Sequence, residues 1–171
     1  AEKSNFVEVC YLLLNGELPD ETQAEEWNHH ITYHTYVHEN ITRFMQGFRY
    51  DAHPMGTLVS TIAALSTFYP EAKDIDDPHN RLIQTIRLIA KMPTMAAFAY
   101  KNRLGLPYEY PVNNLGYTGN FLRMMWNVAD PGYEPDPVLT KALDVLLILH
   151  ADHEQNCSTT TMRTVGSSNA D

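Results

Sequence analysis

The residues most able to do chemistry lie in the stretch from Ile148 to Ser168, ILHADHEQNCSTTTMRTVGSS. It places two histidines, two acidic residues and an asparagine at the end of a strongly apolar segment, where polar groups without partners would be costly to bury. His150 and His153 are three positions apart and so share roughly one helix face. A ring nitrogen of His153 can hydrogen-bond a ligand while an acidic group or a carbonyl fixes its tautomer. The stretch therefore predicts a binding or catalytic site.

Two other chemistries could use the same residues. His150, His153 and Glu154 could bind zinc, although His-x-x-His-Glu is not the His-Glu-x-x-His spacing of zinc enzymes. Cys157 could instead act as a thiolate paired with His153, because a helix start favours the thiolate. The free N–H groups of that helix start would also favour an anion. These alternatives stay open at this level, and we expect no metal site in the chain.

Four further histidines lie within residues 25–40, EEWNHHITYHTYVHEN. His30, His34 and His38 recur every four residues, so on an unbroken helix they would share one face with Glu26. Such a row could hold a metal. Since no nearby Cys or Asp completes the set, a solvated polar helix face is the favoured interpretation.

Two other sets of charged residues could bind an anion. Arg49 and Asp51 precede a helix start at His53, but an N-cap role is favoured for His53. Arg87 and Lys91 are four residues apart on a helix, and we interpret them as solvated surface charges.

Prolines mark the starts of several helices that must position these residues, because proline at the first helical turn loses no hydrogen bond. Apolar residues follow them at spacings of three and four. These prolines are Pro54, Pro78, Pro93 and Pro137. Asp20 and Gln23 form the pattern of a capping box for a helix over about 21–33, and another helix is predicted over about 39–46. Because period-two alternation is never sustained, the fold class is predicted to be all-α, with about eight helices.

Composition excludes several classes of protein. The 171 residues carry 12 basic and 21 acidic side chains, a net charge of −9, and 44% hydrophobic residues. This composition builds a globular core and is not that of a collagen or a disordered chain. The acidic balance argues against nucleic acid as a partner, because phosphate binding needs a basic face. No apolar run approaches the roughly 20 residues that span a bilayer, and two cysteines are typical of a reducing compartment.

The string HADHEQN, with the following CSTTTMRTVGSS, resembles the oxaloacetate-binding segment of the citrate synthase family. Four other segments look like the large domain of that family, in the same order: FVEVCYLLLNGELP, DAHPMGTLVSTIAALSTFYP, KMPTMAAFAYK and YTGNFLRMMW. The resemblance covers essentially the whole chain. HADHEQN and KMPTMAA look more like bacterial enzymes, which suggests a cytoplasmic location, whereas NCST is similar to a plant peroxisomal branch.

The resemblance implies condensation of acetyl-CoA with oxaloacetate and water to give citrate and CoA, the first step of the tricarboxylic acid cycle. It implies that His153 donates a hydrogen bond to oxaloacetate and that His150 and Asn156 support the same site. It further implies an acyltransferase without a cofactor, since acetyl-CoA is a substrate, and a homodimer or hexamer assembled through large-domain helices.

The sequence also departs from the family pattern. Nothing resembles the later segments that carry the acid and base of the reaction, so the catalytic residues are expected beyond Asp171. Residues 1–171 are therefore expected to form a single all-helical segment of the large domain, without the small domain or the catalytic part, and to be inactive alone. The alternatives are a 2-methylcitrate synthase, which accepts propionyl-CoA, and a catalytically inert helical module that binds a partner or a dicarboxylate.

Overall fold

A computed structural model describes residues 3–151 and 157–168. Within these ranges the chain forms eight α-helices, two short 3₁₀ turns and no strand, which confirms the all-α prediction. The helices are α1 (Phe6–Asn15), α2 (Glu21–Tyr33), α3 (Glu39–Gln46), α4 (Pro54–Leu65), α5 (Pro78–Leu104), α6 (Tyr117–Trp126), α7 (Pro137–Ala151) and α8 (Cys157–Ser167), and the 3₁₀ turns are η1 (Ser66–Phe68) and η2 (Pro70–Lys73). None of the described helices is long and apolar enough to cross a bilayer.

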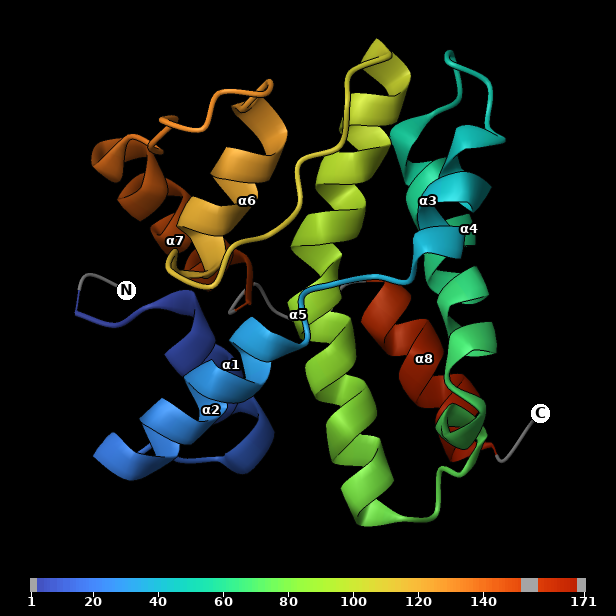
Figure 1. The fold of residues 1–171 in the computed structure, drawn as a ribbon. Coiled ribbons are helices and arrows are strands. Elements are labelled where there is room, and N and C mark those ends of the chain that lie inside the picture. Colours follow the sequence, from blue (N-terminus) through green and yellow to red (C-terminus); the bar gives the residue numbers. More distant parts are fainter. Residues whose placement is uncertain (1–2, 152–156, 169–171) are drawn as a thin grey trace.

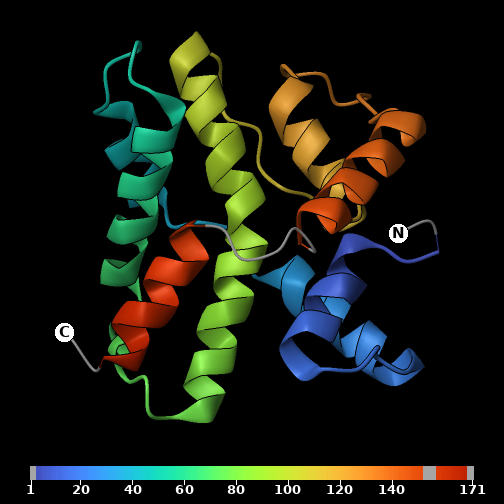
Figure 2. The ribbon, with the colours of Figure 1, turned by 180° about the vertical axis from the view of Figure 1, so that it is seen from behind.

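The longest helix, α5, runs through the middle of the molecule (Figure 1). Helices α3 and α4 pack along one side of it, and α2 and α6 pack along the other. Helix α7 lies against α1 and α6 and does not share an extensive contact with α5. The view from behind shows the same division (Figure 2). The helix that ends at the predicted site is thus held by α1 and α6, which α5 in turn supports.

Local sequence signals explain where most helices begin. Asp20 and Gln23 form the expected capping box, with Gln23 N–H donating to Asp20 Oδ1 at 2.8 Å and Asp20 N–H donating to Gln23 Oε1 at 2.9 Å. Asp77 caps α5, and its carboxylate accepts from the next two free backbone N–H groups. His53 caps α4, since its Nδ1 accepts from Met55 N–H at 3.2 Å. Helix starts at 21, 54, 78 and 137 are therefore confirmed.

The predicted helix start at Pro93 is wrong, because Pro93 lies inside α5. A proline in a helix interior has no N–H for the carbonyl four residues earlier, which here is Ile89. Tyr117, at the start of α6, supplies the missing donor: its hydroxyl donates to Ile89 O at 2.9 Å. A side chain from another helix thus satisfies the carbonyl that Pro93 leaves free.

The buried side chains form two clusters on either side of this proline. The first cluster packs the C-terminal half of α5 against α3 and α4 and contains Met95 and Phe98, with Ile41 and Met45 of α3. The second packs the N-terminal half of α5 against α1 and α2 and contains Ile86, Ala90, Val7, Trp27 and Ile31. Trp27 also donates its indole N–H to Val7 O at 2.9 Å. Helix α5 is therefore the common wall of both clusters.

Candidate functional site

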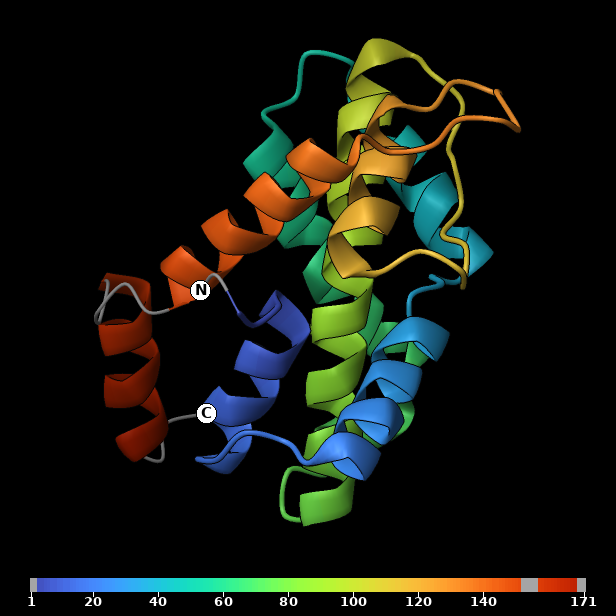
Figure 3. The ribbon, with the colours of Figure 1, turned by 90° about the vertical axis from the view of Figure 1, so that its left-hand side faces the viewer.

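Helix α7 carries His150 in its last turn, and Asp136 fixes its start. The Asp136 carboxylate accepts from Val138 N–H at 2.7 Å and Leu139 N–H at 3.1 Å, which satisfies two of the free donors that a helix start presents. Figure 3 shows α7 crossing the molecule obliquely from the loop after α6 toward α8.

A buried carboxylate joins the middle of α7 to α1. Asp144 is 8% exposed, and its Oδ1 accepts from Phe6 N–H, the first residue of α1, at 2.9 Å. Lys141, one turn earlier on α7, lies 3.4 Å from the other Asp144 oxygen and donates to Ser4 O at 3.1 Å. A buried charge is stable only when it is paired and hydrogen-bonded, and Asp144 meets both conditions. These contacts fix the direction of α7.

The ring of His150 has a defined orientation. His150 is exposed, and its Nδ1 lies 2.7 Å from Leu146 O. A carbonyl only accepts, so Nδ1 carries a proton and the free nitrogen is Nε2. In the neutral ring Nε2 accepts a hydrogen bond, and in the imidazolium it donates one. A cationic ring would meet the negative end of the helix dipole and could donate to a carboxylate.

Two of the predicted substrate-binding residues, His153 and Asn156, lie outside the described residues, as does Glu154 of the alternative zinc set. The structure describes the chain again from Cys157, the first residue of α8. All described residues of α8 are exposed, and Figure 3 shows this helix standing apart from the others. The hydroxyl of Thr161 donates back to Cys157 O at 2.8 Å, so it satisfies the backbone of its own helix. Of the three predicted substrate-binding residues, His150 is thus the one that lies within the described residues.

The two cysteines differ in environment. Cys157 is exposed, whereas Cys10 is buried in the cluster between α1, α2 and α5. Burial raises the pKa of the Cys10 thiol to about 11, because the thiolate would be desolvated there. Cys10 is therefore a core residue without nucleophilic character.

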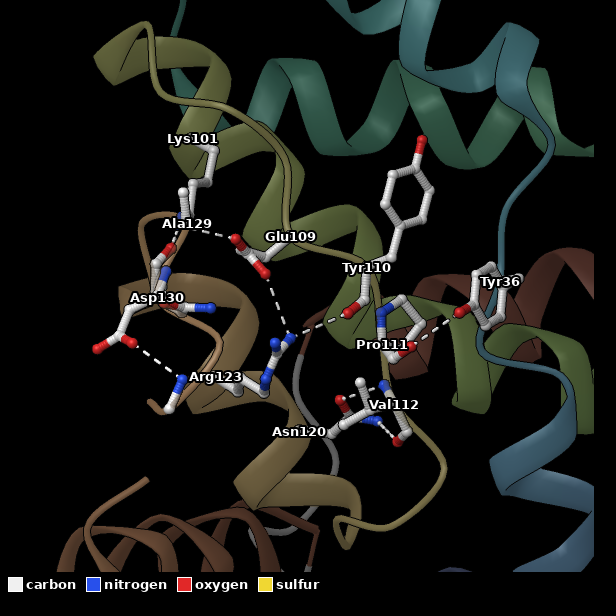
Figure 4. Close-up of polar contacts among 12 residues, drawn as sticks. Tyr36, Lys101, Glu109, Tyr110, Pro111, Val112, Asn120, Arg123, Ala129 and Asp130 are labelled. Carbon is white, nitrogen blue, oxygen red and sulfur yellow. Dashed lines mark hydrogen bonds and ion pairs between the residues drawn. The ribbon is translucent and has the colours of Figure 1, made fainter. Parts of the chain in front are cut away.

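A polar network that the sequence analysis did not predict fixes α6, and through it α7 (Figure 4). The buried side-chain amide of Asn120 accepts from Val112 N–H at 3.1 Å and donates to Val112 O at 2.9 Å. It thus pairs with both backbone groups of Val112, as a neighbouring strand would. Arg123, one turn later, bridges to Glu109 at 3.3 Å. Glu109 also accepts from Ala129 N–H at 3.1 Å. The segments before and after α6 are thereby fastened to the helix itself.

The same network reaches α5 and the link between α2 and α3. Lys101 is fully buried in α5, and its ammonium donates to Asn127 O at the end of α6. The hydroxyl of Tyr36 donates to Pro111 O at 3.0 Å (Figure 4). Lys101 lies with Phe98 on the buried side of α5. A cation at a core position of a helix is a sequence signal that could have predicted a buried hydrogen-bonded lysine.

Lys91 is not the solvated surface cation that the sequence analysis favoured. It is 3% exposed, and its ammonium donates to His34 O and to Tyr36 O, both at 2.6 Å. Burial lowers its pKa to about 8, and the positive charge of Arg87 adds to this effect. Arg87 itself pairs with Glu71 at 2.5 Å and lies over the Tyr69 ring, 4.1 Å from its centroid. The spacing of Arg87 and Lys91 could not show this burial, because the acceptors of Lys91 lie more than 50 residues away in sequence.

Geometry also decides two alternatives that lie within the described residues. Arg49 pairs with Asp51 at 2.8 Å, and with His53 acting as a helix cap these residues do not converge on an anion site. The helical row of three histidines is interrupted, because α2 ends at Tyr33, His34 caps its end and His38 caps the start of α3. In the described part of the chain, no group of three or more His, Cys, Asp or Glu side chains converges on a possible metal position.

Comparison with known proteins decides the family. The family model described as "Citrate synthase, C-terminal domain" matches residues 1–171. The chain belongs to the citrate synthase family. Among curated proteins it is similar to the peroxisomal citrate synthase of Dictyostelium discoideum, with 54% identity over 178 aligned residues that cover 100% of this chain and 36% of the relative. A second citrate synthase of Dictyostelium discoideum is 51% identical over 178 aligned residues, covering 100% of this chain and 35% of that protein.

Solved structures agree with this placement in the citrate synthase family. The crystal structure of citrate synthase from Pyrobaculum aerophilum superimposes with a TM-score of 0.86 at 30% identity, covering 99% of this chain and 43% of that one. Citrate synthase from Thermotoga maritima has a TM-score of 0.79 at 22% identity, covering 99% and 42% respectively, which shows a shared fold. The chain thus spans about a third of the length of the curated relatives it matches.

Proposed function

We propose that the protein to which this chain belongs condenses acetyl-CoA with oxaloacetate and water to give citrate and CoA. The observation that carries this proposal is the match of the family model over residues 1–171, together with two relatives at 51% and 54% identity that are both named citrate synthase. Those names do not favour the alternative 2-methylcitrate synthase. They also count against an inert helical module.

His153 is the proposed oxaloacetate donor, and His150 and Asn156 support it. Oxaloacetate is a dicarboxylate, and a charge-assisted hydrogen bond to such a ligand contributes roughly 1.5 to 3 kcal/mol. The orientation of His150 supports its part, because its Nδ1 is occupied by Leu146 O and its Nε2 is left for a ligand. The acid and base of the condensation are expected outside residues 1–171, so this segment contributes binding groups.

The test is His153→Ala in the full-length protein. Losing one hydrogen bond of about 2 to 3 kcal/mol in the transition state lowers kcat/KM for oxaloacetate by roughly 30-fold to 150-fold. His79→Ala, which removes an exposed histidine in the first turn of α5, is the matched control and should leave kcat/KM unchanged. A His153→Ala enzyme within twofold of the parent would overturn the proposed role.

Substrate choice and assembly are tested separately. Comparing kcat/KM for acetyl-CoA and propionyl-CoA distinguishes a citrate synthase from a 2-methylcitrate synthase. We expect activity without any added cofactor, and a homodimer or hexamer formed through the large-domain helices, to be measured by light scattering after size-exclusion chromatography. A cytoplasmic location stays a prediction from the sequence, to be checked by fractionation, since one relative is named peroxisomal.

A further inference from the structure

Two histidines near the C-terminal end of α2 are not used by the citrate synthase assignment. His30 is exposed in the last turn of α2, and His34 follows four residues later as the C-cap. Residues four apart are neighbours on a helix surface, and the two ring centroids lie 6.2 Å apart. We propose that His30 and His34 chelate a divalent transition-metal ion such as Zn²⁺.

The hydrogen bond of His34 prepares its ring for this role. His34 Nδ1 lies 2.7 Å from His30 O, and because the carbonyl can only accept, Nδ1 carries the proton. The lone pair of the neutral ring is therefore on Nε2, the nitrogen not used in this bond. Metal-binding histidines characteristically donate their other ring N–H to a carbonyl or carboxylate, which fixes both tautomer and orientation. Here the backbone of the first histidine orients the second.

The backbone at His34 is also fixed from the core. His34 O accepts from the buried Lys91 ammonium at 2.6 Å, so the residue is tied to α5. One half of the chelate is therefore held in place before a metal arrives, which lowers the entropy cost of binding. Only the exposed side chain of His30 has to adjust.

The distance between the rings fits one shared ion. An imidazole nitrogen binds Zn²⁺ at about 2.1 Å, so two rings on one tetrahedral ion have centroids roughly 5 to 5.5 Å apart. The observed 6.2 Å is closed by a small rotation of His30, whose ring nitrogens have no hydrogen bond within the described part of the chain. Imidazole ligands suit zinc, copper and nickel rather than calcium or magnesium.

The surroundings favour a cation, and the neighbouring His29 makes a separate ring contact. Glu25 and Glu26 line the same shallow hollow as His29 and His30, and the whole chain carries a net charge of −9. The neighbouring ring of His29 is packed against Tyr33, with centroids 4.2 Å apart. Water would complete the coordination of this two-histidine site, because no group of three or more ligand side chains converges among the described residues.

The experiment is a titration of the full-length protein with ZnCl₂ by isothermal titration calorimetry, accompanied by the Zn²⁺-induced shift of Tm. We expect His30→Ala to bind one Zn²⁺ fewer than the parent and to lose part of the Tm shift. His34→Ala should lose the same ion, and His29→Ala is the matched control that keeps it. Because His30 is exposed, its variant tests the pair even if the His34 variant does not fold.

Two results would overturn the proposal. In one, His30→Ala binds as much Zn²⁺ as the parent. In the other, His29→Ala loses as much as His30→Ala, so that the ion belongs to a different pair. Neither result bears on the proposed condensation, since His30 is remote from the HADHEQN segment in sequence and its test needs no substrate.

Discussion

The hydrogen bond from Tyr117 to α5 offers a direct test of how the central helix tolerates its proline. Tyr117→Phe removes only the hydroxyl, which donates to Ile89 O at 2.9 Å. Pro93 cannot replace that donor, so the carbonyl is left without its partner. An unsatisfied carbonyl in a partly buried position costs about 1 to 2 kcal/mol. Burial also raises the pKa of Tyr117, which keeps the hydroxyl protonated and able to donate.

This cost should be visible as faster local opening of α5. With about 1.4 kcal/mol for each tenfold change, backbone amides near the middle of α5 should exchange with deuterium roughly 5-fold to 30-fold faster in Tyr117→Phe. Hydrogen–deuterium exchange with mass spectrometry measures this for each peptide. Tyr108→Phe is the matched control, because its hydroxyl donates to the Asn102 side chain at 3.2 Å and not to a backbone carbonyl freed by proline.

Repeating Tyr117→Phe in a Pro93→Ala protein tests whether the cost arises from the proline. Pro93→Ala restores an N–H that can donate to Ile89 O within the helix, so Tyr117→Phe should cost clearly less there than in the parent. Comparing the two differences removes the packing change that Pro93→Ala itself brings. An identical cost of Tyr117→Phe in both backgrounds would refute the pairing of Tyr117 with the proline.

Three further predictions concern other buried groups. Because the pKa of Lys91 falls from 10.5 to about 8 on folding, the unfolded state binds more protons between these values, and stability rises with pH there. In urea unfolding, the free energy of unfolding should increase by about 1 kcal/mol between pH 8 and 9, and Lys91→Met should lack this increase. Equal pH dependence of the free energy of unfolding in the two proteins would contradict this cause. Asn120→Ala breaks two bonds to Val112 at a cost of about 1 to 3 kcal/mol, so residues 106–116 should exchange faster while α2 is unchanged. At pH 8 iodoacetamide should label the exposed Cys157, and peptide mapping should find Cys10, with its pKa near 11, labelled only after unfolding.

Local signals were sufficient for most of the fold. The capping box of Asp20 and Gln23 and the caps before Pro54, Pro78 and Pro137 depend on neighbouring residues alone, so the sequence displays them directly. Pro93 obeys the same local rule but lies inside a helix, because the donor that compensates it comes from α6. Such a partner has no signature near the proline in sequence.

The candidate site was predicted by a different route. His153 and Asn156 were assigned through resemblance of their segment to a family, and their roles stay predictions. The Nδ1 contact of His150 follows from helix geometry and is seen only in the structure. The buried position of Lys91 depends on acceptors in a distant segment, so charge and spacing alone suggested solvent exposure.

The exposure of α8 has a thermodynamic consequence. A free helix of its 11 residues is too short to overcome the cost of nucleation, because isolated helices below about 12 to 15 residues are marginal in water. The hydroxyls of Thr161 and Thr164 bond to carbonyls of α8 itself, and every described residue of the helix is exposed. A surface that covered α8 would therefore supply free energy to its helical state. Folding of α8 and binding of that covering surface are therefore one linked equilibrium, in which strengthening either strengthens the other.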